Sequence, residues 1–368
     1  MVGGFLLRAQ RSLKAHAEIN SVALHAIGTN IEATLCDMAT AAGKFMPRRD
    51  CDQIRSMRLR TREAVACGPK ENRGSEKDTM MASVMRSSVQ WVKHDFSGAY
   101  NRKWPHAYFR AHLALDYTIP DRAKPVFEKL FADYRRLRNK TELKIVDIGC
   151  SYGVNAALLR SNLDLDDLYA EYLGSSGSLS RRLDIEHRAF FHSCGLRDDI
   201  RFVGVDPSFR AVHYARNQGL LEGGIPADLE ARDLTVKERC ALADADIIIS
   251  TGCVGYATER TFARVYKAAA ASRPWVVVFA MHPFSYHEIA TTLREFALET
   301  RLVDRFRQRQ RRFSTTTERQ AILTAMAELG IEDRLERTTG YVYASCYISA
   351  PPGEVLYGRT LISAAKSQ

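Results

Sequence analysis

The hydrophobic positions of the chain change from one regular spacing to another near residue 140. Before that point, residues 121–139 place apolar side chains three and four positions apart, at Val126, Phe127, Leu130, Phe131, Tyr134 and Leu137. Such spacing is typical of one face of a helix. After it, residues 144–148 form a short, mostly apolar run that Gly149 ends. A run of this length that a glycine ends is typical of a buried strand, so the pattern predicts a helix followed by a strand.

The same alternation continues to residue 350. Further strands are predicted at 200–206, 228–234, 246–250, 275–280, 300–313 and 341–350, and helices at 154–163, 208–220, 258–272, 286–299 and 315–330. Strands that are almost continuously apolar and alternate with helices indicate a parallel sheet with helices on both faces. The sequence therefore predicts a doubly wound, mostly parallel α/β domain with seven strands.

Two segments do not follow this alternation. Residues 162–199 connect the first helix after residue 150 to the second strand, and they are too long for an ordinary loop. We expect a helical insertion there that forms part of a lid over a substrate. Residues 1–79 contain a possible helix at 19–38 and then a polar, charged stretch, so we expect a poorly ordered extension, or a spurious one if translation begins near Met80.

Composition narrows the class of protein. No apolar run approaches the roughly 18–20 residues that a membrane-spanning helix needs, and the apolar patch at the N-terminus is too short for a convincing secretory signal. The eight cysteines form no C-x-x-C pair and no cluster with zinc-ligand spacing. We therefore expect a cytoplasmic protein with reduced thiols, no membrane partner and no metal.

The net charge of +10 leaves two interpretations open. A basic surface attracts nucleic acid or anionic substrates. Most of the excess is spread along the chain, however, with one dense stretch at 305–312, and no recognisable RNA-binding module is present. The diffuse charge favours solvation of the surface over binding to nucleic acid.

The most informative stretch follows the first predicted strand, where residues 144–153 read KIVDIGCSYG. A dinucleotide-binding enzyme would have G-x-G-x-x-G at this turn. Here Ser151 stands where the second glycine would be, and no third glycine follows at the required spacing. The turn is therefore a poor match to the loop that holds a pyrophosphate, and a nicotinamide oxidoreductase is the weakest of the enzyme hypotheses.

Residues 146–153 (VDIGCSYG) instead resemble motif I of the Rossmann-like (class I) S-adenosylmethionine-dependent methyltransferases. In that family an acid and a glycine-rich turn after the first strand wrap the amino-acid part of the cofactor. The resemblance also implies that an acid ending the second strand binds the ribose hydroxyls and that one ending the third meets the adenine. Contacts to S-adenosyl-L-methionine are thus implied for Asp147, Gly149, Cys150, Ser151, Gly153, Asp206, Pro207, Asp233, Leu234, Ser250 and Thr251.

Candidate catalytic residues are fewer. His282 directly follows the fifth predicted strand, at the edge where this family binds its substrate, and a histidine is a suitable base for a hydroxyl acceptor. A histidine that is hydrogen-bonded beneath a loop is an equally good interpretation. Tyr256 and His287 are weaker candidates. The fourth strand ends STGCVGY and lacks the Asn/Asp-Pro-Pro-Tyr sequence of enzymes that methylate amino groups on bases and proteins.

Two further motifs have competing explanations. Arg305, Arg307, Arg309 and Arg311 would share one face of a strand and could bind an anionic group. Such a row more often protects an exposed sheet edge from pairing with another strand. Residues 104–110 (WPHAYFR) are rich in aromatic side chains, which would either close over the cofactor, as N-terminal segments of this family do, or pack in the core.

The sequence thus leads to one main hypothesis, a methyltransferase that transfers a methyl group to oxygen or carbon of a small molecule. The alternatives are an RNA or protein methyltransferase and a non-catalytic protein that binds S-adenosylmethionine. The expected organisation is an extension at 1–79, a helical lid segment at 80–140, a methyltransferase domain at 141–350 and a tail at 351–368.

Overall fold

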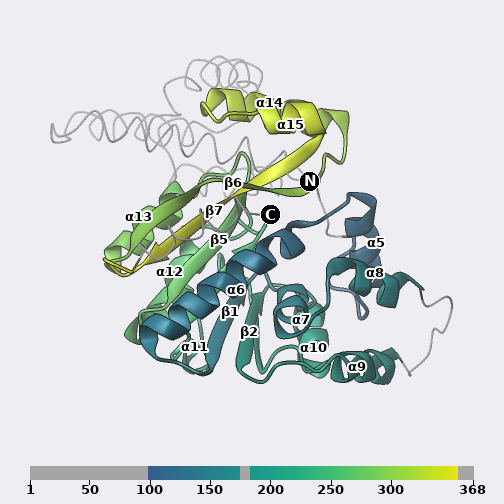
Figure 1. Cartoon of the computed structure of the whole chain (residues 1–368), viewed down its shortest axis with the longest axis vertical. Helices are drawn as coiled ribbons and strands as arrows, with labels where there is room; N and C mark the ends of the chain where they lie inside the picture. Colours follow the sequence, from purple (N-terminus) through teal and green to yellow (C-terminus); the bar gives the residue numbers. More distant parts are fainter. Residues whose placement is uncertain (1–97, 175–182, 355–368) are drawn as a thin grey trace, which may run out of the picture. The chain divides into compact units, whose positions relative to one another are not determined.

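The computed structural model of the chain describes residues 98–174 and 183–354, with the side chains of 183–184 and 304–306 left out (Figure 1). The expected extension at 1–79, its helix at 19–38 and residues 355–368 of the tail lie outside the described residues.

A seven-stranded sheet forms the centre of the domain, in the order β3-β2-β1-β4-β5-β7-β6 (Figure 1). Strands β1 to β5 are parallel, and β7 runs antiparallel to both of its neighbours, β5 and β6. The strands are β1 (Leu143–Ile148), β2 (Ile200–Asp206), β3 (Gly223–Pro226), β4 (Ile247–Thr251), β5 (Trp275–Met281), β6 (Glu299–Arg312) and β7 (Tyr341–Ala350). The predicted mostly parallel sheet of seven strands is confirmed.

The described helices are more numerous than the pattern predicted. They are α5 (His106–Ala114), α6 (Ile119–Arg138), α7 (Val154–Arg160), α8 (Leu165–Gly174), α9 (Leu183–Ser193), α10 (Phe209–Asn217), α11 (Val236–Leu242), α12 (Glu259–Ala269), α13 (His287–Glu295), α14 (Thr316–Glu328) and α15 (Arg334–Thr339). Helices α6, α7, α10, α12, α13 and α14 correspond to predicted helical segments. The short helices α11 and α15 have no counterpart in the predictions.

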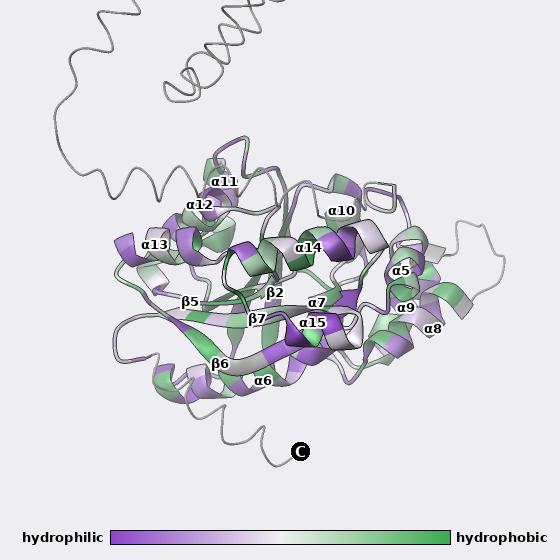
Figure 2. Ribbon diagram, turned by 90° about the horizontal axis from the view of Figure 1, so that it is seen from above, coloured by the Kyte–Doolittle hydropathy of each residue, from purple (hydrophilic) through white to green (hydrophobic). Residues whose placement is uncertain are grey.

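Each central strand contributes to two hydrophobic cores, one on each face of the sheet. In β1, Ile145 packs in the core beneath α6, α7 and α10, whereas Val146 packs in the core beneath α11, α12 and α13. Successive side chains of a strand point to opposite faces, so a strand between two helical layers must be apolar at nearly every position. Figure 2 shows the covering helices with mixed hydrophobic and hydrophilic bands. The continuous apolar runs in the sequence follow from this three-layer arrangement.

The strand predicted at 228–234 is wrong. The third strand is β3, a four-residue edge strand that pairs only with β2, and the chain turns directly after it. Asp228 begins the turn, because its Oδ1 accepts a hydrogen bond from the Glu230 N–H at 2.9 Å. Aspartate favours turns for this reason. The sequence GGIP of β3 has few residues that favour strands, so pairing with β2 determines it rather than local preference.

The long insertion contains α8 and α9, which confirms its helical character. It packs against α5 and α10 through aromatic rings. Phe109 of α5 stacks on Tyr172 of α8 with ring centres 4.4 Å apart. The Tyr214 hydroxyl of α10 lies 3.1 Å from the Tyr172 hydroxyl and 2.8 Å from Nδ1 of His187. The insertion therefore supports α5 from behind.

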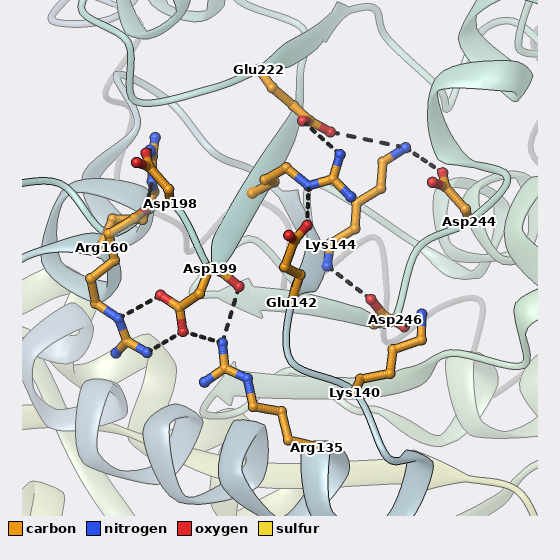
Figure 3. Close-up of polar contacts among 12 residues, drawn as sticks. Arg135, Lys140, Glu142, Lys144, Arg160, Asp198, Asp199, Glu222, Asp244 and Asp246 are labelled. Carbon is orange, nitrogen blue, oxygen red and sulfur yellow. Dashed lines mark hydrogen bonds and ion pairs between the residues drawn. The ribbon is translucent and has the colours of Figure 1, made fainter.

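Ion pairs gather where the parallel strands begin (Figure 3). The most buried acid there is Asp246, at 2% exposure. Its Oδ1 accepts from Lys140 Nζ at 2.6 Å and its Oδ2 accepts from the Lys144 N–H at 2.9 Å (Figure 3). The Tyr134 hydroxyl lies 3.3 Å from Oδ1. Asp246 thus joins the end of α6 to β1 and β4.

We expect Asp246→Ala to lower the free energy of unfolding by about 2 kcal/mol, because the buried Lys144 N–H and the Tyr134 hydroxyl lose their acceptor. Urea unfolding measures this change. Asp198→Ala is the matched control, since Asp198 is exposed and lies 3.9 Å from its partner Arg160. If Asp246→Ala lowers the free energy of unfolding by no more than the control does, the structural role given to this acid is contradicted.

Candidate functional site

A cavity of about 520 Å³ lies at the carboxyl ends of the parallel strands. In open α/β sheets this edge is where ligands bind. Its described walls come from the ends of β1 to β6 and from the segment before α6. Its lining residues include Tyr100, Tyr108, His112, Tyr117, Gly149, Cys150, Ser151, Asn155, Asp206, Pro207, Asp228, Leu229, Glu230, Thr251, Gly252, Tyr256, Met281, Gln310 and Arg311.

The turn after β1 forms the floor of this cavity. Gly149 has a φ of +80°, and a Cβ atom at this position would lie 2.7 Å from Cβ of Cys253. Only glycine combines this backbone conformation with so close an approach. Gly153 has a φ of +83° and begins α7, where a Cβ atom would lie 3.0 Å from Cβ of Ala215. Gly149 therefore shapes the cavity, whereas Gly153 does not line it and allows α7 to pack on α10.

Asp206 ends β2 and is the central acid of the cavity. Its Oδ2 accepts a hydrogen bond from the Ser151 N–H at 3.0 Å, and its Oδ1 accepts one from the Ser208 N–H at 2.8 Å. Burial raises the pKa of this carboxyl above its usual value, and the two N–H donors oppose that shift. A carboxylate has about four acceptor positions, so two remain for a ligand. The two N–H groups fix the carboxylate next to the Gly149 turn.

Asp147 lies beneath the cavity and does not line it. Both of its carboxyl oxygens accept from Asn155 Nδ2, at 3.1 and 3.2 Å, and the same nitrogen lies 3.1 Å from Oγ1 of Thr251. Burial raises the pKa of Asp147 to about 8, the Asn155 bonds lower it, and the charge of Asp206 raises it further. Asp147 therefore positions Asn155 and Thr251, which do line the cavity, and orders the turn between β1 and α7.

The structure brings most of the predicted cofactor residues together. The predicted residues that line the cavity are Gly149, Cys150, Ser151, Asp206, Pro207, Thr251 and Tyr256. Ser250 does not line it: the side chain is fully buried, and its Oγ lies 2.8 Å from Sγ of Cys253. The contacts that any of these residues make with a cofactor stay predictions.

Asp233 and Leu234 are corrections to the sequence analysis. The Asp233 side chain is 84% exposed and pairs with Arg264 at 2.5 Å, outside the cavity. Leu234 is buried in the core beneath α11 to α13. Because the third strand ends at residue 226, the acid that lies at its carboxyl end is Asp228. Asp228 and Leu229 occupy the place that the sequence analysis gave to Asp233 and Leu234.

His282 is a second correction, because it does not line the cavity and both its ring nitrogens are engaged. Nδ1 lies 2.7 Å from Oε1 of Glu336, and Nε2 lies 2.8 Å from Oγ of Ser345. The three side chains connect α15 to β5 and β7. The interpretation as a histidine hydrogen-bonded beneath other structure is correct, and the role of base for a substrate is not supported. His287 is exposed at the start of α13.

We expect His282→Ala to lower the free energy of unfolding by about 2–3 kcal/mol, because the fully buried Glu336 carboxyl loses its partner. The dissociation constant of a ligand in the cavity should stay within about twofold of the wild-type value, a change too small to indicate a lost hydrogen bond. Chemical denaturation and calorimetric titration of the same sample measure both quantities. His287→Ala serves as the exposed control. Loss of ligand binding in a folded His282→Ala variant would show that His282 contributes to the site.

The segment before α6 forms an aromatic wall that the sequence analysis only partly anticipated. His112 stacks on Tyr108 with ring centres 3.9 Å apart and meets the edge of Tyr117 at 4.6 Å. Tyr100 meets Tyr108 edge to face at 5.3 Å. The stretch WPHAYFR was the signal for this wall. Within residues 80–140, α6 covers a face of the sheet and so is not part of a lid. The expected lid role of the rest of this segment stays a prediction.

The insertion at 162–199 does not fulfil the expectation of a substrate lid, since none of its described residues lines the cavity. It packs behind α5 through the rings of Tyr172 and His187, as described above. The aromatic wall that carries Tyr108 and His112 therefore lies between the insertion and the cavity.

The row of arginines on β6 is interrupted by a β-bulge. Arg309 pairs with Tyr343 of β7, but Arg311 pairs with the next residue, Val342, so Gln310 is extra. Figure 2 shows this part of β6 as hydrophilic. The guanidinium of Arg309 lies over the Tyr341 ring at 4.5 Å, on the edge strand β6, and both interpretations of the arginine row stay predictions. A bulge redirects the following side chain, and both Gln310 and Arg311 are buried against the cavity.

Arg311 is tied to the start of α14. Its two terminal nitrogens donate to the two carboxyl oxygens of Glu318 at 3.0 and 2.7 Å, and both side chains are at most 4% exposed. Burial acts to raise the pKa of Glu318, but the hydrogen bonds and charge of Arg311, together with hydrogen bonds from Ser314, outweigh it, so the pKa is lowered. This buried ion pair fixes the β6 side of the cavity. Arg305 lies outside the side chains that the structure describes.

Comparisons with known proteins give structural matches only. No protein-family model matches the sequence, and neither does any curated protein. The plantazolicin methyltransferase BamL has a TM-score of 0.37 at 12% identity, covering 73% of this chain and 98% of its own. A TehB-like methyltransferase from Corynebacterium glutamicum has 0.30 at 13%, covering 62% and 96%. Magnesium protoporphyrin IX methyltransferase from Synechocystis has 0.31 at 12%, covering 62% and 80%.

All three TM-scores are below 0.5, so the fold assignment rests on the topology of this chain. Five parallel strands are followed by an antiparallel β7 inserted between β5 and β6, and a glycine turn joins β1 to the first helix after it. This is the Rossmann-like methyltransferase fold.

The cavity has two halves that differ in charge. One half is acidic, because Asp206, Asp228 and Glu230 follow β2 and β3 there. The other half has no described acids and is lined by Met281 at the end of β5 and Gln310 on β6.

Two kinds of feature are absent from the described ranges, 98–174 and 183–354. No helix within them is long and apolar enough to cross a membrane. No group of three or more His, Cys, Asp or Glu side chains within them is arranged to hold a metal ion.

Proposed function

We propose that the chain is an S-adenosyl-L-methionine-dependent methyltransferase that methylates oxygen or carbon of a small molecule. The observation that carries this proposal is Asp206, a buried carboxylate at the end of β2 that two N–H groups hold beside the Gly149 turn. Two adjacent ribose hydroxyls need two adjacent acceptors, and the remaining positions on this carboxylate supply them.

The rest of the acidic half fits the same ligand. Asp228 and Leu229 follow β3 and line the cavity where an adenine would lie, with a polar and an apolar side chain for its edge and its face. The Gly149 turn and Thr251 are available to the amino-acid part. The cavity volume, about 520 Å³, lies within the range of roughly 300–1,000 Å³ that is usual for small-molecule and cofactor sites.

S-adenosylmethionine would supply a methyl group that its positive sulfur activates for displacement. The residues of the chain then have to hold the acceptor in line with that methyl group and exclude water. The aromatic wall of Tyr100, Tyr108, His112 and Tyr117 encloses the site on the N-terminal side. A base is needed only for an acceptor that is protonated at the working pH. We do not assign that role to His282, which lies outside the cavity.

The acceptor class is tested by label transfer. Purified protein is incubated with S-adenosylmethionine that carries tritium in its methyl group and with a cell extract separated into small-molecule, RNA and protein fractions. We expect label in the small-molecule fraction, and less of it with Asp206→Ala when S-adenosylmethionine is kept near the wild-type dissociation constant. Label in RNA or protein would contradict the acceptor class. Tight cofactor binding without transfer to any fraction would instead favour a non-catalytic binding protein.

A further inference from the structure

The half of the cavity away from Asp206 contains a buried amide with an unmet hydrogen-bonding need. Gln310 is 3% exposed and lines the cavity, and its Oε1 has no hydrogen-bond partner among the described residues. Buried polar atoms are nearly always paired, because leaving them unpaired costs free energy. A ligand that donates to this oxygen would satisfy it.

The fold holds Gln310 in place rather than leaving it mobile. Its main-chain oxygen accepts from the Thr118 N–H at 2.8 Å, which fastens the segment before α6 to the bulge of β6. The end of its side chain lies against Gly252, where a Cβ atom would be 2.5 Å from Nε2 but 3.8 Å from Oε1. The nitrogen end is therefore pressed against the end of β4, and the oxygen is directed away from it.

The surroundings of Gln310 select against a cationic ligand. The acids that line the cavity, Asp206, Asp228 and Glu230, follow β2 and β3, on the other side of the sheet order from β6. Met281 follows β5, and Tyr117 precedes Thr118, whose N–H donates to Gln310, so both lie on the Gln310 side, where the only described charge that lines the cavity is Arg311. A positively charged amine would find no counter-ion among these residues. An apolar or aromatic body would find matching side chains.

We propose that Gln310 is a substrate-positioning residue that accepts a hydrogen bond from a neutral hydroxyl or N–H group on an aromatic acceptor. This inference rests on the proposed function, because it assigns the second half of the same cavity to the methyl acceptor. A phenol is the simplest molecule with the required chemistry. A site built to accept such a hydrogen bond discriminates strongly against the analogue that lacks the donor.

The test uses a matched pair of probes with the full-length protein saturated with S-adenosylhomocysteine. Binding of 4-methylphenol is compared with that of 4-methylanisole, in which a methyl group replaces the hydroxyl hydrogen. We expect the phenol to bind about five- to tenfold more tightly, the scale of one neutral hydrogen bond. Gln310→Met should abolish the preference without changing the affinity for S-adenosylhomocysteine.

Two further variants keep the test decisive. Gln218→Met is the matched control. Gln218 is also buried, and its side-chain amide has no hydrogen-bond partner among the described residues, but it lies at the end of α10, outside the cavity, so the preference should persist. Gln310→Glu retains acceptor oxygens and should also retain the preference, which gives an answer even if Gln310→Met does not fold. Equal binding of the two probes to the wild type, no binding of either, or an unchanged preference in folded Gln310→Met would overturn the proposal. Failure to bind S-adenosylhomocysteine would instead overturn the proposed function.

Discussion

Asp206→Ala is expected to weaken binding of S-adenosylmethionine and S-adenosylhomocysteine by about 1–3 kcal/mol, or roughly 5- to 150-fold in the dissociation constant. The reason is that the variant removes the carboxylate that lies at the end of β2 beside the Gly149 turn, together with its acceptor positions. Calorimetric titration measures the affinity. Asp206→Asn, which keeps the shape and one acceptor oxygen, should fall between the wild type and the alanine variant.

The matched control for this prediction is Asp233→Ala. Asp233 was the acid favoured from sequence for the adenine, but it is exposed and pairs with Arg264. Its removal should leave cofactor affinity unchanged. Unfolding measurements on each variant separate a binding effect from a loss of fold, because Asp206 also accepts from the Ser151 and Ser208 N–H groups. Wild-type affinity in a folded Asp206→Ala protein would remove the ribose assignment.

Arg311→Met should produce the largest loss of stability, about 4 kcal/mol, since it leaves the Glu318 carboxylate buried without its cation. Glu318 is 4% exposed and receives both terminal nitrogens of Arg311. Urea unfolding measures the change. Adding Glu318→Gln to Arg311→Met should restore about 2 kcal/mol, because the uncompensated charge is then gone. Losses that simply add, or a loss below about 1 kcal/mol, would show that this pair does not stabilise the β6 side of the cavity.

The pH dependence of the same pair has a definite sign. The pKa of Glu318 is lowered in the folded protein from an ordinary value of 4.5. A carboxyl with a lowered pKa contributes stability above its ordinary pKa and loses it as the pH falls through the folded-state pKa. The difference in unfolding free energy between wild type and Arg311→Met should therefore narrow below about pH 4.5. A difference that is constant from pH 7 to pH 3 would contradict the ionic nature of the contact.

The sheet could be predicted from sequence because burial on both faces requires strands that are apolar at nearly every position. Residues 341–350 were predicted as a strand with the bounds that β7 has. The third strand could not be predicted in the same way. The sequence GGIP has little preference for a strand, and its pairing with β2 determines its conformation. The site could be anticipated only to the extent that carboxyl ends of parallel strands meet at one edge, which places Gly149 and Asp206 together.

Other parts of the site depend on structure that no local pattern encodes. The predicted third strand ended at residue 234, whereas β3 ends at Pro226, and this error moved the expected acid from Asp228 to Asp233. One extra residue in β6 turns Arg311 inward, although strict alternation would keep it with Arg307 and Arg309. The role of His282 depends on Glu336 of α15, a helix too short for its periodicity to be recognised. Each of these outcomes is decided by a long-range contact.

The most direct test of the central claim is calorimetric titration of the purified full-length protein with S-adenosylmethionine, S-adenosylhomocysteine and, as a control, NADH. The geometry around Gly149 and Asp206 predicts micromolar binding of both sulfur compounds and no binding of NADH, whose pyrophosphate needs the glycines that the turn lacks. Binding of NADH, with no binding of S-adenosylmethionine or S-adenosylhomocysteine, would contradict the assignment of this cavity.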